Sequence, residues 1–298
     1  MINIINMINM PLQSLRYLPM FNGEFWEIFN ISLWVCMLIY SLKTRGGLDT
    51  LKIFLIGMIY GLVLENGGPM YVPELGFYGY FYEDMYKLYL FEFFGVGIRI
   101  SSVPLATHLG WSNVFLVCLL FWEAIVKAFP KLKKHIVLGG FIMAISGWLL
   151  DLNLDPLATR FRWWVWNDNL LPVWFGVPLM NYVAWFWAVG VFGAVWVWIH
   201  EILVPGRTKE DKKKQIKLLI MMLFPMWVID TIYVMTCRFV MELAGIMYIT
   251  PYPIVWQIWY LLPIAGFASI PLYVVYVKWL KKRIPWPKWL LPAETVTK

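Results

Sequence analysis

Long apolar stretches separated by short polar segments dominate the chain. A membrane-spanning helix needs about 20 mostly apolar residues, and several stretches meet or approach this length. The pattern predicts an all-α integral membrane protein that forms a single polytopic membrane domain over residues 1–298. Residues 1–20, with asparagines spaced among Ile and Met, are typical of an interfacial segment. We expect seven transmembrane helices, at residues 25–42, 50–66, 102–127, 136–152, 177–203, 216–240 and 254–279.

Basic residues fall in four short clusters, which follow the first, third, fifth and seventh predicted helices. All four clusters therefore lie on one side of the membrane. Because cytoplasmic loops carry an excess of Lys and Arg, we predict an outside N-terminus and a cytoplasmic C-terminus for a multi-pass protein of the cell membrane. Two aromatic segments, 69–101 and 153–176, then cannot span the membrane, since each would move the later clusters to the other side.

The composition supports this class of protein and excludes others. Of 298 residues, 61% are hydrophobic and 14% are charged, which is more apolar surface than one soluble core can bury. The net charge of +7 resides mainly in the loop clusters, so we expect the lipid bilayer as a partner and no nucleic acid. Aromatic residues make up 18% of the chain, beyond the need of two interfacial belts.

A repeated pattern lies within the predicted helices. Tyr-Phe-Tyr-Glu-Asp at residues 80–84 is echoed by Trp-Val-Trp-Asn-Asp at residues 164–168. Val-Pro-Leu starts residues 103–111 and again residues 177–185, and both segments end on Trp. The pattern predicts a duplicated helix-loop-helix unit, with repeats at 50–127 and 136–203 and the last two helices in 216–279. Repeats of this kind often place a binding site at their interface.

Ionisable side chains within transmembrane helices are costly and are functional candidates by default. Glu65, Asp151 and Asp155 fall toward the predicted outer ends of their helices. His108 and Asn181 begin the next helices on the same side, and Asp230 lies near the middle of the sixth. The polar groups thus converge on one half of the membrane.

Asp151 and Asp155 form the sharpest local feature. Side chains at i and i+4 share one helix face, where like charges repel, so either a cation bridges the two groups or one of them holds a proton. A carboxylic acid kept neutral in an apolar wall is a general acid. The alternative is structural: Arg160 or Arg162 pairs with the two carboxylates, and the group only closes the helix end.

Other chemistries find little support in the sequence. Three single cysteines and three scattered histidines give no metal-ligand pattern, and His108 suits a hydrogen-bonded structural role. Before Lys278, the predicted seventh helix has no lysine for a retinal Schiff base. We therefore expect no metal and no cofactor.

The polar and aromatic blocks resemble the carotenoid hydratase family, which includes bisanhydrobacterioruberin hydratase and gamma-carotene hydratase. Glu65 and residues 80–82 carry part of the likeness, which runs from about residue 55 to 200. Its most specific part extends from Asp151 to Trp185 and includes Asp-Leu-Asn-Leu-Asp-Pro-Leu-Ala at 151–158 and Phe-Gly-Val-Pro-Leu-Met-Asn at 175–181. The resemblance implies addition of water to the terminal double bond of an acyclic carotenoid, without a redox cofactor.

That reaction suits the residues. Protonation of a trisubstituted alkene gives a tertiary cation, which water then captures, so an acid in a dry aromatic pocket is the equipment needed. We expect Asp151 and Asp155 to supply the proton, with Glu65 or Asp230 as the next candidates. Tyrosines and an asparagine would place the water, and tryptophan rings would face the cation. The expected substrate-binding residues are Tyr80, Tyr82, His108, Trp111, Trp164, Trp166, Asn181 and Trp185.

Three alternatives stay open at this point. A lycopene-type cyclase uses the same proton-initiated cation, and a membrane prenyltransferase would bind magnesium and a diphosphate at paired aspartates. The non-enzyme alternative is a transporter or a carotenoid-binding protein whose halves rock around a central site.

Overall fold

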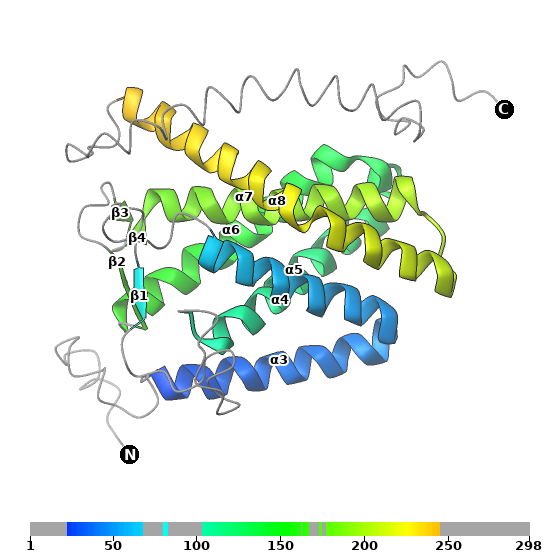
Figure 1. The fold of residues 1–298 in the computed structure, drawn as a ribbon, viewed down its shortest axis with the longest axis horizontal. Coiled ribbons are helices and arrows are strands. Elements are labelled where there is room, and N and C mark those ends of the chain that lie inside the picture. Colours follow the sequence, from blue (N-terminus) through cyan, green and yellow to red (C-terminus); the bar gives the residue numbers. More distant parts are fainter. Residues whose placement is uncertain are drawn as a thin grey trace. The chain divides into compact units, whose positions relative to one another are not determined.

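Long α-helices make up most of the described chain. A computed structural model describes residues 23–67, 80–82, 103–161, 163–166, 173–174 and 177–244 (Figure 1). Six helices in these ranges are long and apolar enough to cross a membrane, which confirms the all-α membrane fold and the first six predicted spans. The expected seventh helix and the N-terminal segment lie outside the described residues. The helices are α3 (Gly23–Arg45), α4 (Gly47–Gly67), α5 (Leu105–Ala128), α6 (Ile136–Arg160), α7 (Leu179–Val197) and α8 (Lys209–Leu243).

Four very short strands accompany the helices. Strand β1 (Tyr80–Tyr82) pairs antiparallel with β2 (Trp164–Trp166), and β3 (Val173–Trp174) pairs with β4 (Val177–Pro178). The β1–β2 partners are thus the two segments that echo each other in the sequence. Helices α5 and α7 both begin at the leucine of their Val-Pro-Leu.

The chain divides into two compact units. The first comprises Met1–Leu116 and Leu149–Tyr182, and the second comprises Val117–Trp148 and Val183–Lys298. The first unit contains all candidate site residues except Trp185 and Asp230. We call the part of the first unit where α4 and α6 end, and where α5 and α7 begin, the strand side.

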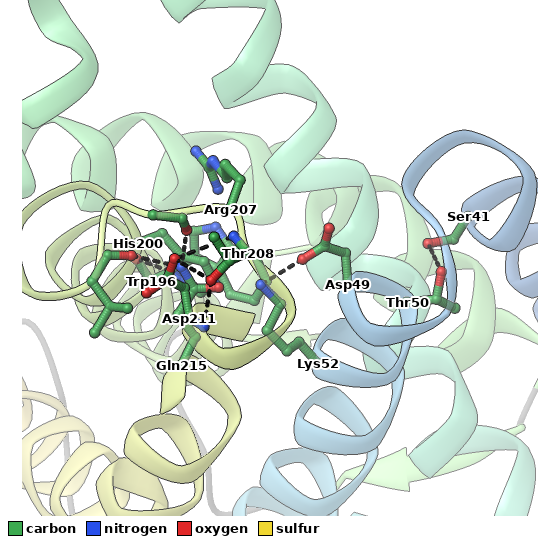
Figure 2. A network of polar contacts seen from close by, with 12 residues as sticks. Ser41, Asp49, Thr50, Lys52, Trp196, His200, Arg207, Thr208, Asp211 and Gln215 are labelled. Atoms are coloured by element: carbon green, nitrogen blue, oxygen red, sulfur yellow. Dashed lines mark hydrogen bonds and ion pairs between the residues drawn. The ribbon is translucent and has the colours of Figure 1, made fainter. Parts of the chain in front are cut away.

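A tight corner joins α3 to α4. Gly46 has a φ of +82°, the left-handed conformation in which glycine commonly ends a helix, and its N–H donates to Leu42. The Ser41 and Thr50 hydroxyls hydrogen-bond at 2.9 Å across this corner (Figure 2). Because the corner is so short, Lys52 lies inside α4, where it is ion-paired with Asp49 at 2.5 Å.

Small residues bring paired helices close together in each unit. In the first unit, a Cβ added at Gly57 of α4 would lie 2.9 Å from the Ser112 Cα of α5, and the Ser112 hydroxyl donates to the Phe54 carbonyl at 3.0 Å. In the second unit, a Cβ added at Gly140 of α6 would lie 2.7 Å from the Gly190 carbonyl oxygen of α7. Such close approach is the usual packing mode of helices in membranes, where there is no hydrophobic driving force between helices.

Two boundaries differ from the prediction. Helix α6 continues to Arg160 with Pro156 inside it, so residues 153–160 are helical and do not belong to the expected loop. Helix α8 begins at Lys209, seven residues before the predicted start at 216, because Thr208 and Asp211 cap it reciprocally (Figure 2). The apolar pattern does not predict either extension, because residues 153–160 contain a proline and residues 209–215 are mostly charged.

Candidate functional site

Two buried carboxyl groups stand one turn apart on α6, at the strand side. Asp151 is 0% exposed and Asp155 is 3% exposed. Their side chains hydrogen-bond to each other. Such a bond needs a proton on one of the two carboxyl groups, which then acts as its donor.

Asn181 joins the two carboxyl groups from the neighbouring helix. Its side-chain Nδ2 donates to Asp155 Oδ2 at 2.5 Å and to Asp151 Oδ2 and Oδ1 at 3.1 and 3.3 Å. The residue stands in the first turn of α7, which follows directly on β4 and holds it opposite the last turns of α6. Because an amide nitrogen carries two hydrogens, one side chain serves both acids.

The structural alternative for the pair involves arginines whose side chains the structure does not describe. Arg160 and Arg162 both lie in this category. Among the side chains that are described, no lysine or arginine forms an ion pair with Asp151 or Asp155. The pair instead accepts hydrogen bonds from Asn181.

Tyr182 belongs to the same group, although the sequence did not single it out. It is 3% exposed and interacts electrostatically with both Asp151 and Asp155. Tyr182 lies three residues after the leucine that starts α7, and His108 lies three residues after the leucine that starts α5. In an alignment of the two repeats, Tyr182 would therefore have matched His108, which was already an expected site residue.

A third carboxyl group lies nearby on α4. Glu65 is 7% exposed and accepts a hydrogen bond at 2.7 Å from the indole N–H of Trp111 on α5. The Glu65 and Asp155 carboxyl groups interact electrostatically. Three predicted acids therefore meet at the strand side, and Trp111 has a polar partner that the sequence did not predict.

Tryptophans from α3 and from residues 163–166 pack against Leu154 and Ala158 of α6, the helix that carries Asp151 and Asp155. Trp164 of β2 is buried with Trp26 of α3 and with Trp163 in one apolar cluster. The Trp26 and Trp163 rings stack at 4.3 Å, and the Trp26 and Trp164 rings meet edge-on at 6.4 Å. Trp166 packs against the same cluster, and its indole N–H donates to Thr159 Oγ1 at 2.9 Å. The predicted Trp164 and Trp166 thus pack in one cluster with Trp26 and Trp163, which the sequence analysis did not select.

The remaining predicted residues are His108, Tyr80, Tyr82, Trp185 and Asp230. His108 is buried in the first turn of α5 and hydrogen-bonds the backbone of Val103. Tyr80 and Tyr82 are placed by the β1 backbone, and their side chains lie outside the description. Trp185 on α7 and the buried Asp230 on α8 belong to the second unit.

Metal ligands do not gather in the described part of the chain. Within residues 23–67, 80–82, 103–161, 163–166, 173–174 and 177–244, no three His, Cys, Asp or Glu side chains are placed to hold a metal ion. The acids instead have hydrogen-bond donors from neighbouring helices as partners. Their arrangement suits the storage and transfer of protons.

The fold is that of a multi-pass membrane protein, with a group of buried acids, two of them on a helix that also contacts a tryptophan cluster. A family model described as "carotenoid biosynthesis protein" matches residues 25–251. The chain belongs to this family and functions in carotenoid biosynthesis, with a carotenoid as its substrate. No curated protein and no solved structure matches the chain.

Proposed function

We propose that the protein adds water across the terminal carbon–carbon double bond of an acyclic carotenoid. The observation that supports this most directly is the buried pair of Asp151 and Asp155, which hydrogen-bond to each other and are bridged by Asn181. A proton held in an apolar, aromatic environment can be passed to an alkene only where water does not compete for it. Membership of the carotenoid biosynthesis family supplies a polyene substrate for such an acid.

The proposed reaction is a hydration in two steps. The proton of the aspartate pair bonds to the less substituted carbon of the double bond, whose electron pair forms the new C–H bond. A tertiary cation remains at the other carbon, and the oxygen of a water molecule bonds to it. The water then loses one proton to a carboxylate, so the net change is one added water and no oxidant, reductant or cofactor is consumed.

The aromatic side chains have a defined part in this proposal. Ring faces stabilise a nearby cation by up to about 2 kcal/mol each when it is desolvated. Trp164 and Trp166 are the predicted residues that lie in the cluster beside α6. Tyr80 and Tyr82 remain candidates for placing the water, because β1 pairs with the strand that carries these tryptophans.

The test is to express Asp151→Asn and Asp155→Asn in a host that makes an acyclic carotenoid and to analyse the pigments by chromatography and mass spectrometry. We expect the wild-type protein to add the mass of one water, and each variant to lose about 10²–10⁴-fold of that activity. Asn153→Ala is the matched control, since Asn153 lies between the two acids on an exposed face of α6. Undiminished hydration in both aspartate variants would defeat the acid assignment.

The wild-type pigments also separate the alternatives. A ring-containing product of unchanged mass would indicate a cyclase. A magnesium-dependent gain of an isoprenoid unit would indicate a prenyltransferase. Carotenoid that is bound and recovered unchanged would indicate a transporter or a binding protein.

A further inference from the structure

The two helical hairpins of the predicted repeat, α4 with α5 and α6 with α7, have the same internal register. A Cβ added at Gly57 of α4 would contact Phe115 at 3.1 Å, and one added at Gly147 of α6 would contact Val189 at 2.6 Å. Phe115 and Val189 each lie ten residues after the leucine that starts their helix. The two glycines therefore occupy equivalent positions in the two hairpins.

Glu65 lies eight residues after Gly57 on α4, and Asp155 lies eight residues after Gly147 on α6. Glu65 and Asp155 are therefore equivalent residues of the two hairpins. The pairing of β1 with β2 agrees with such a duplication. Phe81 and Val165 are the middle residues of the two strands and lie opposite each other, so the register stays the same when the two strands are exchanged. Glu65 and Asp155 both belong to the first unit, and their carboxyl groups interact electrostatically.

The two equivalent carboxyl groups differ in their partners. Asp155 hydrogen-bonds with a second acid, Asp151, and the bond between them requires a proton. Glu65 instead accepts a bond from the indole N–H of Trp111, a group that can only donate. The bond from Trp111 thus fixes the orientation of the Glu65 carboxyl group, whereas Asp155 has a second acid as its partner.

We propose that Glu65 is the base of the reaction and that Trp111 is its positioning residue. This assignment rests on the hydration proposed above. The aspartate pair gives its proton to the alkene carbon, and the water oxygen bonds to the resulting cation. One proton of that water then passes to the Glu65 carboxylate. Return of this proton from Glu65 to the aspartate pair restores the starting state with one water added.

The test separates the two proton transfers by running the reaction in heavy water. A cation that water does not capture can return a proton to the aspartate pair and re-form the alkene, which leaves deuterium in the recovered substrate. Membranes containing each full-length variant are incubated with an acyclic carotenoid in heavy water. Mass spectrometry then measures both the hydrated product and the deuterium in unreacted carotenoid.

We expect Glu65→Gln to lower hydration by about 10²–10⁴-fold while deuterium exchange into the substrate persists. Trp111→Phe keeps an aromatic ring but removes the N–H, so hydration should fall about tenfold to hundredfold, again with exchange retained. Trp148→Phe is the matched control, because Trp148 is 39% exposed on α6 in the second unit, and both readouts should stay at the wild-type level.

Each contrary outcome has a separate meaning. Wild-type hydration in both Glu65→Gln and Trp111→Phe would overturn the base assignment and leave the proposed function standing. Loss of exchange together with hydration in Trp111→Phe, at an unchanged melting temperature, would make Glu65 part of the acid and also overturn it. A wild-type protein that adds no water at all would defeat the proposed hydration itself.

Discussion

The two hairpins share a framework but differ at two positions that face the acids. Asp151 lies one turn before Asp155 in the second hairpin, and the equivalent position of the first hairpin is Gly61. Asn181 lies two residues after the leucine that starts α7, and the equivalent residue of α5 is Thr107. The second hairpin thus has two acids and an amide where the first has one acid.

The difference shows how a duplicated framework can hold a proton on one side and an acceptor on the other. A Cβ at Gly61 would lie 2.6 Å from the Trp111 side chain, so the glycine leaves the room that the indole occupies. The indole N–H then reaches Glu65. In the second hairpin a carboxyl group takes the place of that glycine and serves as the partner of Asp155. In the mechanism that we propose, divergence at this one helix position separates the roles of proton donor and base.

The largest loss of hydration should follow from removing the Asn181 amide of the second hairpin. Asn181→Leu keeps the volume of the side chain but removes the donor to both Asp151 and Asp155. Because hydrogen bonds to charged groups contribute about 1.5–3 kcal/mol each, we expect hydration to fall at least about hundredfold. Product formation per amount of folded protein, measured by chromatography, checks this.

Asn153→Leu controls for the apolar substitution, since Asn153 is exposed and bonds only its own helix at Leu149 in the described contacts. It should keep full activity. Asn181→Leu should lower hydration more than Trp111→Phe does. The Asn181 amide donates hydrogen bonds to two carboxyl groups, whereas the Trp111 indole donates to one. A larger loss in Trp111→Phe would reverse that ranking and would contradict our account of the difference.

Replacing Gly61 of the first hairpin should lower hydration by an intermediate amount. Gly61→Ala places a methyl group against the base of the Trp111 side chain, which must tilt away from Glu65. Gly140→Ala in the second unit places its methyl against the Gly190 carbonyl and touches no candidate site residue. Overpacking costs about 1–3 kcal/mol of stability in either variant. Hydration per folded protein should fall about tenfold in Gly61→Ala alone, the rate equivalent of one lost bond.

Thermal melting in detergent gives the stability of both glycine variants, and pigment analysis gives their activity. Equal losses of normalised activity would mean that packing alone controls the reaction. They would also remove the special link between Gly61 and the acid group.

Much of this arrangement could be predicted from the sequence, because local patterns carry it. Apolar length gave six confirmed helices, and the i, i+4 spacing identified Asp151 and Asp155 as neighbours on one helix face. The end of α6 was not predictable, since Pro156 is ordinarily a sign that a helix stops. Here Leu154 and Ala158 pack against the tryptophan cluster, and burial holds the helix together beyond the proline.

Contacts between distant residues could not be predicted in the same way. The Trp111 bond to Glu65 joins residues 46 positions apart, and the Asn181 bond to Asp155 joins residues 26 apart. Nothing in a single sequence states which helices are neighbours or at what height. The exact equivalence of Glu65 with Asp155 was also out of reach, because it depends on the packing of glycines against the opposite helix.

The smallest effect concerns the hydrogen bond that ties strand β2 to the end of its own helix, α6. The Trp166 indole N–H donates to Thr159 Oγ1 at 2.9 Å and anchors β2 to the end of α6. Trp166→Phe and Thr159→Val should each lower the free energy of unfolding by about 1 kcal/mol, the usual value of one hydrogen bond. The double variant should lose little more than either single one, because both remove the same bond. Melting in detergent measures this cycle, and additive losses would show that the bond does not hold the strand.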